Sequence, residues 1–202
     1  MTITTAHLSV SLDGYVAGPD QTFEDPLGRG GIALHTWHLP TTELNEVDQR
    51  WTERLLRPRG AYVMGRNMYG PVRGGWDSWE GEWRGWWGDE PPYHAPVFVL
   101  THHARDPVEM AGGTTFHFVT GGVEEALRLA REAGAGDVDI AGGASAVRQV
   151  IALGALDELT LDIAPVVLGA GERLFDGSVQ PTLELLEAEH SPWTTHVRYR
   201  VS

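Results

Sequence analysis

The spacing of hydrophobic and polar residues changes along the chain, and each change marks a predicted element. Over residues 6–12 apolar and polar residues alternate, which predicts a half-buried strand. The Gly- and Pro-rich residues 13–40 predict a long loop, of a kind that is usually functional or mobile. Thr41 or Thr42 is a candidate N-cap for a helix ending near residue 57. Its predicted apolar face consists of Leu44, Val47, Trp51 and Leu55.

The next part of the chain alternates short apolar runs with amphipathic stretches. Residues 61–64 predict a buried strand, and residues 73–94 are irregular. Further strands are predicted at 97–100, 115–119, 138–141 and 159–164. Helical periodicity follows the strands at 115–119 and 138–141. Strands that alternate with helices of this length imply crossover connections and a largely parallel sheet.

The last twenty residues have a different pattern. Residues 182–190 and 195–201 flank a Ser191-Pro192 turn, which predicts an antiparallel hairpin at one edge of the sheet. No linker or low-complexity tract interrupts the chain, so we expect one domain over residues 1–202. The predicted fold class is α/β, with three layers: a central, mostly parallel sheet with this C-terminal edge hairpin, and helices on both faces.

Composition excludes several kinds of chemistry. The 202 residues include no cysteine and no lysine, so all 15 basic residues are arginine. Without cysteine there is no disulfide, thiolate nucleophile or Cys-ligated metal. Without lysine there is no Schiff-base mechanism and no P-loop lysine. The candidate chemistry is therefore that of carboxylates, histidines, hydroxyls, a metal or a bound cofactor.

Charge and hydropathy indicate the expected environment. The formal charge of −13 argues against a surface that binds nucleic acid or an anionic membrane. No apolar run approaches the 18 residues of a membrane span, and residues 1–4 lack the start of a signal peptide. We therefore expect a cytoplasmic protein without nucleic-acid or membrane partners.

Three junctions run from a predicted strand through glycine toward a helix. Such a junction offers free backbone amides and the positive end of the helix dipole to an anion. Glu124 and Glu125 follow Gly121-Gly122 and would repel a phosphate, so we interpret that junction as structural. The first turn after Gly142-Gly143 has no acid, and Arg66 follows Gly65. Arginine binds phosphate in a bidentate way.

Two such junctions suit a dinucleotide better than a mononucleotide. Neither matches the G-x-G-x-x-G fingerprint, so a standard Rossmann site is not predicted. The alternative is that these glycines only permit tight turns. Two other kinds of site fit poorly: the segment from Gly143 lacks the second glycine of a nucleophile elbow, and no histidine pair has zincin spacing.

Several motifs together resemble the dihydrofolate reductase superfamily. The closest branch is the one that includes the reductase domain of the bifunctional riboflavin-biosynthesis deaminase/reductase. The motifs are SLDGYVAG at 11–18, VMGRNMY at 63–69, VFVLT at 97–101 and IAGGAS at 140–145. The segment 154–175 strengthens the match to this branch. The resemblance covers about residues 2–200.

The resemblance implies a dihydrofolate-reductase-like fold that binds NADPH along the carboxyl ends of the strands. It implies that the pyrophosphate and adenosine side contacts Gly65, Arg66, Asn67 and Met68. For the adenine and 2′-phosphate it implies Leu100, Thr101 and His102, although a solvated loop is the alternative for His102. For the pyrophosphate and nicotinamide side it implies Ala141, Gly142, Gly143, Ala144, Ser145 and Ala146. Val16 and Ala17 would border the nicotinamide.

The resemblance also implies an acid on the helix before the strand at 61–64, which contacts the substrate ring. Asp48 is the candidate, and the alternative is an exposed helix charge beside Glu46 and Arg50. Asp13 is a weaker candidate, because Asp-Gly after a strand is also ordinary turn chemistry. Ile140 stands where the riboflavin-pathway reductase typically carries an acid, which puts its substrate in doubt.

The expected function is that of a stand-alone NADPH-dependent reductase, acting on a flat nitrogen heterocycle such as a pterin or a ribosylaminopyrimidine. The zinc-binding deaminase motif is absent from these residues. The alternatives are a catalytically silent nucleotide-binding or oligomeric scaffold of the same fold, and a flavin-binding protein. The resemblance further implies a homodimer. Five tryptophans within 76–87 predict either an aromatic lid over a planar ring or a packing surface.

Overall fold

The computed structural model describes residues 2–39, 45–71 and 74–202. Within these residues one sheet of nine strands has the order β10-β11-β8-β1-β7-β3-β4-β6-β5. Its strands are β1 (Thr4–Ser11), β3 (Ala61–Gly65), β4 (Pro96–Leu100), β5 (Val108–Glu109), β6 (Thr115–Val119), β7 (Val138–Gly142), β8 (Glu158–Ala164), β10 (Leu183–His190) and β11 (Thr195–Val201). A separate two-stranded sheet pairs β2 (Tyr15–Ala17) with β9 (Glu172–Arg173).

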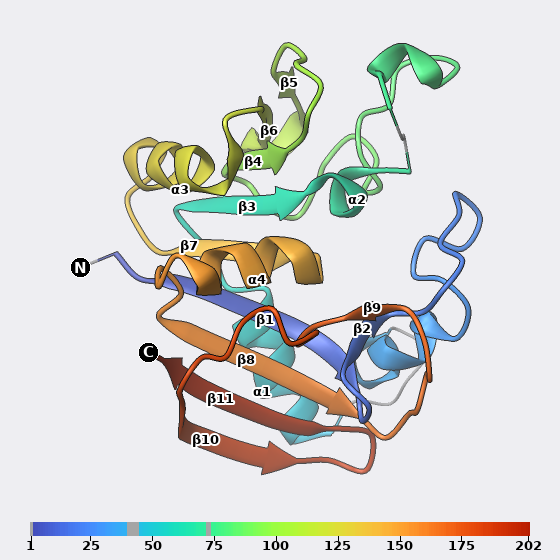
Figure 1. Ribbon diagram of the computed structural model, residues 1–202, viewed down its shortest axis with the longest axis vertical. Coiled ribbons are helices and arrows are strands. Elements are labelled where there is room, and N and C mark those ends of the chain that lie inside the picture. The colour runs from blue at the N-terminus through green and yellow to red at the C-terminus, as the bar shows by residue number, and fades with distance from the viewer. Residues whose placement is uncertain (1, 40–44, 72–73) are drawn as a thin grey trace.

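The fold prediction is confirmed. The six strands from β8 to β6 are parallel, whereas β11 is antiparallel to β8 and β10 is antiparallel to β11. Figure 1 shows this hairpin at one edge of the sheet, and β5 with β6 at the other. The carboxyl ends of the parallel strands therefore form one continuous edge, where α/β proteins usually bind ligands.

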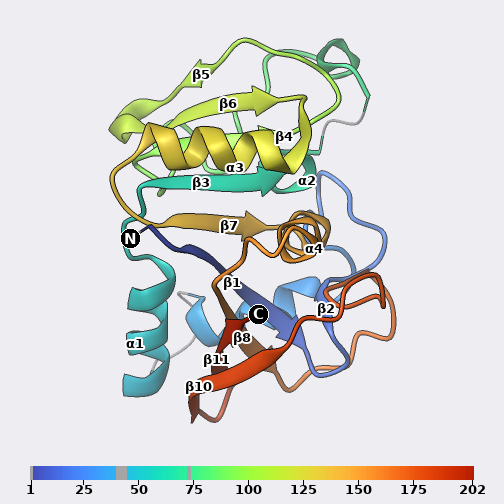
Figure 2. The same ribbon diagram turned by 60° about the vertical axis from the view of Figure 1, so that its left-hand side comes forward.

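Helices cover both faces of the sheet. The α-helices are α1 (Glu46–Leu55), α2 (Arg66–Tyr69), α3 (Gly122–Ala133) and α4 (Ala144–Ala152), and the 3-10 helices are η1 (Gly31–His38), η2 (Trp76–Ser78) and η3 (Ala111–Gly113). Figures 1 and 2 show α3 and α4 on one face and α1 on the opposite face. Helix η1 contacts β1, β8 and α1, so it lies on the α1 side.

The main hydrophobic core lies between the sheet and the pair α3 and α4. Ala126, Leu127 and Ala130 of α3 are buried against it, in the i, i+1, i+4 pattern of a helix that presents one face. Helix α4 contributes Val147 and Val150. A second cluster, around Tyr62, Tyr69, Val97, Val99 and Phe116, lies under the segment between α2 and β4.

Strand β1 corrects one prediction. Its residues alternate as predicted, but all eight are buried, so the strand is not half-buried. Ala6, Leu8 and Val10 join the main core, while the polar residues lie on the face covered by α1 and η1. A buried polar group is costly unless it is hydrogen-bonded. Each polar side chain of this face has a partner: Thr5 with Asp139, His7 with Asp162, Ser9 with Trp37 and Ser11 with Asp13.

Two predicted boundaries also change. The predicted loop over residues 13–40 contains β2 and η1, whose short lengths left no periodic signal. The predicted caps Thr41 and Thr42, together with Leu44, lie outside the described residues. Among the described residues the cap of α1 is Asn45, whose side-chain oxygen accepts hydrogen bonds from the amides of Val47 and Asp48. No helix in the described part of the chain is long and apolar enough to span a bilayer.

Candidate functional site

Two glycine turns meet at the carboxyl edge of the sheet. Strands β3 and β7 are parallel neighbours, with Met64 opposite Gly142. A Cβ atom added to Gly65, at the end of β3, would lie 3.6 Å from the backbone nitrogen of Gly143. The two predicted anion-binding turns are therefore parts of one surface.

The turn after β7 leaves the main chain accessible. Gly142 has a φ of +125°, a backbone conformation that residues other than glycine rarely adopt. A Cβ atom at Gly143 would meet nothing within 4 Å, so open space lies beside this backbone. Helix α4 starts at Ala144 with no acidic residue in its first turn. Its first amides have no acceptor within the helix, so a phosphate fits here.

Arg66 is held between two elements at this edge. It is the first residue of α2, and its Nη1 donates a hydrogen bond to Oγ1 of Thr101 at 3.0 Å. Its guanidinium stacks on the ring of Trp76, with Cζ 3.6 Å from the ring centroid. The indole of Trp76 donates in turn to the carbonyl oxygen of His103 at 2.8 Å. The sequence motif did not indicate the contribution of Trp76, which is ten residues away.

The other predicted cofactor residues surround this surface to different extents. Leu100 pairs with Gly65, and the Met68 sulfur lies 4.0 Å from the Cβ position of Gly142. Asn67, His102 and Ser145 are exposed, whereas Ala144 and Ala146 are buried residues of the first turn of α4. Ala141 is half-buried on β7. Val16 and Ala17 lie on β2, which packs against β1 and η1.

The tryptophan-rich segment packs onto α2 and onto a distant loop. The Trp83 indole donates to the Tyr69 carbonyl oxygen at 3.0 Å, and the Tyr69 hydroxyl donates to the Trp83 carbonyl oxygen at 2.9 Å. Phe23 contacts the rings of Trp79, Trp83 and Trp86 at centroid distances of 5.3, 5.9 and 6.0 Å. These three tryptophans, with Trp76, are packing residues in the structure, whereas Trp87 is 55% exposed.

Asp13 does not join this surface. Its carboxylate accepts hydrogen bonds from the Ser11 hydroxyl at 2.6 Å and from the amides of Leu168 and Gly169 at 3.1 and 2.7 Å. These hydrogen bonds lower the pKa of Asp13 from 3.8 to about 2, and the bond from Ser11 has the largest effect. The described contacts of this carboxylate are those of a loop clamp.

Asp48 lies elsewhere than its sequence context indicated. It is fully buried, so it is not an exposed helix charge. Its Oδ1 lies 3.1 Å from Nε2 of His196, whose Nδ1 lies 2.6 Å from Oδ1 of Asp162. The other oxygen of Asp162 lies 2.7 Å from Nε2 of His7. Sequence reasoning missed His7, Asp162 and His196.

Ile140 is also buried. It is 0% exposed and lies in the main hydrophobic core, on the face of β7 toward α3 and α4. An acid at this position would need a partner that this core does not offer. Among the described residues, no three His, Asp or Glu side chains are arranged to hold a metal ion.

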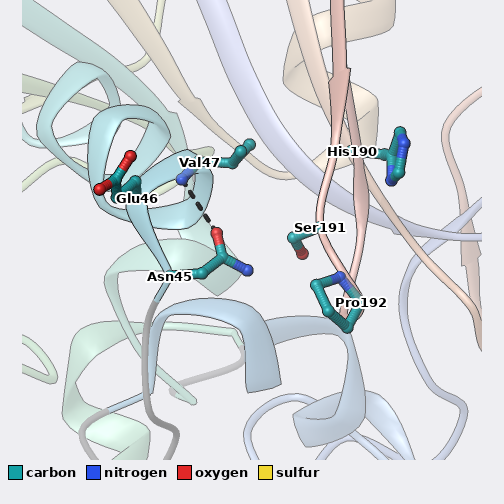
Figure 3. A pocket seen from close by; sticks show the side chains of 6 residues that line it. All are labelled: Asn45, Glu46, Val47, His190, Ser191 and Pro192. Carbon is teal, nitrogen blue, oxygen red and sulfur yellow. Dashed lines mark hydrogen bonds between the residues drawn. The ribbon is translucent and has the colours of Figure 1, made fainter.

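Two cavities lie outside the glycine surface. The first, of about 490 Å³, lies between the start of α1 and the β10–β11 turn. Figure 3 shows Asn45 and Val47 on one side, Ser191 and Pro192 on the other, and His190 directed away from the helix. The second, of about 470 Å³, lies between α1 and the sheet and is lined by His7, Thr160 and five arginines.

Comparison with known proteins agrees with the architecture. Residues 3–197 match the family described as the RibD C-terminal domain. No curated protein matches the sequence.

Three solved structures share the fold across the whole chain. A protein from Shewanella sp. PV-4, assigned to riboflavin biosynthesis, is 20% identical with a TM-score of 0.65, over 100% of this chain and 99% of that one. The diaminohydroxyphosphoribosylaminopyrimidine deaminase/5-amino-6-(5-phosphoribosylamino)uracil reductase of Thermotoga maritima is 15% identical with a TM-score of 0.60, and the match covers 100% of this chain and 57% of that one. A pyrimidine reductase-like protein of Corynebacterium diphtheriae is 17% identical with a TM-score of 0.58, and the match covers 100% of this chain and 92% of that one.

Proposed function

Because the chain belongs to the RibD C-terminal domain family, a branch of proteins with the dihydrofolate reductase fold, we propose that it is an NADPH-dependent reductase of a flat nitrogen heterocycle. When bound, NADPH supplies a hydride, which adds to the carbon of a C=N bond while a proton adds to the nitrogen and NADP⁺ is released. In such chemistry the protein binds the cofactor and the substrate, orients them toward each other and controls the transfer of the proton.

The observation that supports this proposal best is the convergence of the two glycine turns. Gly65 and Gly143 approach each other, and the space beside Gly143 is open. The start of α4 offers amides without a competing acid, and Arg66 stands at the next strand end. Backbone amides and one guanidinium fit a pyrophosphate, so the absence of lysine is no obstacle.

This surface suggests which residues would hold each part of the cofactor. Gly143, Ala144 and Ser145 would hold the pyrophosphate, and Arg66 with Thr101 would hold the adenosine side. Val16 on β2 would border the nicotinamide. We retain Asp48 as the candidate acid, although its side chain is turned toward His196.

A titration of tryptophan fluorescence tests cofactor binding. Added NADPH should quench the emission in a saturable way at micromolar to millimolar concentrations, because Trp76 stacks on Arg66. Ser145→Asp should weaken the binding of NADPH by roughly tenfold, because the new carboxylate repels the phosphates. The same acid in the first turn of α4 should stabilise the helix by about 0.3–1 kcal/mol, so lost affinity would not reflect unfolding.

Ser145→Asn is the matched control, because it has nearly the same shape and no charge. It should bind NADPH like the wild type. The absence of quenching by NADPH, or equal loss in both variants, would contradict the proposal. Consumption of NADPH with 5-amino-6-(5-phosphoribosylamino)uracil or dihydrofolate then tests the substrate class.

A catalytically silent scaffold is the second candidate, and the burial of Asp48 favours it. A scaffold would bind the nucleotide without turnover. Asp48→Asn separates the two functions, since a reductase should lose turnover and keep its affinity for NADPH.

A further inference from the structure

A chain of buried hydrogen bonds links four elements on the α1 face of the sheet. It runs from His7 on β1 to Asp162 on β8, then to His196 on β11, and ends at Asp48 on α1. All four side chains are at most 3% exposed. The three distances are 2.7, 2.6 and 3.1 Å, all within the range of direct hydrogen bonds.

The geometry at His196 restricts where protons can be. Both ring nitrogens face a carboxylate oxygen: Nδ1 faces Asp162 and Nε2 faces Asp48. An ionised carboxylate only accepts hydrogen bonds, and a neutral imidazole donates from one nitrogen alone. Either His196 is protonated on both nitrogens, or one of the two carboxyl groups carries the proton and donates it to His196.

The surroundings favour the charge on His196. The indole of Trp51 lies parallel to the imidazole, at a centroid distance of 4.8 Å and an angle of 7°, an arrangement that favours a cation. Asp48 lies in the first turn of α1, where the helix dipole favours an ionised carboxylate. Burial alone would raise the pKa of Asp162, but His7 and His196 outweigh it and lower that pKa below its usual value.

The other titratable groups nearby do not supply this charge. On η1, burial and then His38 lower the pKa of His35 to about 4, and burial also lowers the pKa of His38. From β10, Glu189 accepts a hydrogen bond from the Trp51 indole. From β1, Ser9 accepts one from Trp37, which stands edge-on to His196. His7 and His196 are the imidazoles that are hydrogen-bonded to the two aspartates.

Two buried side-chain atoms of this chain of hydrogen bonds are left over, Nδ1 of His7 at one end and Oδ2 of Asp48 at the other. Oδ2 of Asp48 is buried, and it has no hydrogen-bond partner among the described residues. A buried carboxylate oxygen without a partner is costly and suits an N–H donor of a ligand. Val47, the residue before Asp48, lines the first cavity, so this turn of α1 borders an opening.

We propose that His196 is an imidazolium clamped between Asp48 and Asp162, and that it is the positioning residue that keeps Asp48 ionised and oriented for the substrate. This role rests on the proposed reductase function. The Asp48 carboxylate would bind an N–H of the heterocycle through Oδ2, and the proton that the substrate nitrogen gains would come from the Asp48–His196 pair. Solvent replaces that proton after each turnover, so the balance of one hydride and one proton is kept.

Nuclear magnetic resonance of isotope-labelled histidine rings tests the charge without any activity. Near neutral pH, one ring that disappears in His196→Gln should carry protons on both nitrogens. In Asp162→Asn, which keeps the shape of the side chain, the same ring should lose one of them. A single proton on the His196 ring of the wild type would overturn the proposal, because one of the two carboxyl groups would then hold the proton.

Kinetics test the positioning role. Asp162→Asn should shift the pH dependence of kcat/KM and lower kcat about tenfold or more, while NADPH affinity stays unchanged. His117→Gln is the control, because His117 lies on β6 and stacks on Phe98, outside this chain of bonds. An unchanged pH profile in Asp162→Asn overturns the role of His196, whereas absent NADPH binding in the wild type overturns the reductase function alone.

Discussion

Asp13 shows at the residue scale how one carboxylate joins two loops. It lies two residues after the end of β1 and accepts hydrogen bonds from the backbone amides of residues 168 and 169, which are 155 and 156 positions away. Arg173 also donates to its carbonyl oxygen at 3.3 Å. The side chain therefore ties the end of β1 to the loop before β9.

This clamp predicts a particular response to acid. Because the folded pKa of Asp13 is lowered from 3.8 to about 2, its stabilisation is complete above the higher value and is lost as pH falls toward the lower one. Asp13→Asn should remove that part of the pH dependence between roughly pH 4 and 2. Urea unfolding at several acidic pH values measures it, with the exposed Asp106→Asn as control. If the free energy of unfolding changed with pH in the same way in the wild type and in Asp13→Asn, the clamp would be contradicted.

Single residues also show what the sequence could indicate about the site. Gly65, Arg66, Gly142 and Gly143 belong to local motifs, and local backbone chemistry is readable from neighbouring positions. His196 and Asp162 belong to no motif, because their meaning comes from strand pairing. Both stand at polar positions of alternating strands, in register with Thr160 and with Arg198, so no local signal indicated that this face is buried.

At the element scale, the segment from Gly74 to Trp87 is fixed by its contacts with α2. Trp83 exchanges hydrogen bonds with Tyr69, and its indole fills the space beside Gly70. A Cβ atom at Gly70 would lie 2.1 Å from the Trp83 Nε1 atom. The backbone of Gly70 is extended, with a φ of −178°, so only this contact requires glycine.

Gly70→Ala should therefore destabilise the protein by about 1–3 kcal/mol through overpacking. In a Trp83→Leu background the same substitution should cost less, because the indole is gone. Urea unfolding of the four proteins gives the coupling between the two positions. Equal costs in both backgrounds would show that Trp83 does not occupy this space.

Elements with a sustained period were the most predictable. Strands β4, β6, β7 and β8, helix α3 and the edge hairpin lie where the periodicity placed them. The three-residue strand β2 and the 3-10 helix η1 have too few residues for a period to show. The polar face of β1 was read as solvent-exposed, because alternation alone does not reveal whether water or α1 covers that face.

At the scale of the whole molecule, the outer strand β10 is one of the two edges of the nine-stranded sheet. Its residues are exposed or half-exposed along its length, with Leu185 57% exposed. An exposed edge strand is a template for pairing with another strand. We propose that the homodimer implied by the family forms through this edge.

Sedimentation velocity tests the dimer. The wild type should sediment as a species of twice the chain mass of 22.1 kDa. Leu185→Lys should shift the equilibrium toward the monomer. Leu153→Lys is the control, because Leu153 is 46% exposed but lies at the end of α4, away from the edge. A monomeric wild type at all concentrations would exclude pairing through β10.

The place of β1 in the sheet has a consequence for synthesis on the ribosome. Its two neighbours are β7 and β8, so Ala6 pairs with Leu159 and Thr4 with Val138. At 5–20 residues per second, β1 leaves the exit tunnel roughly 10–30 s before β8 can join it. During that interval Leu8 and Val10 have no partner strand, and the nascent chain is a natural client for a chaperone. We expect native structure to form late and cooperatively, once the β8 segment has emerged.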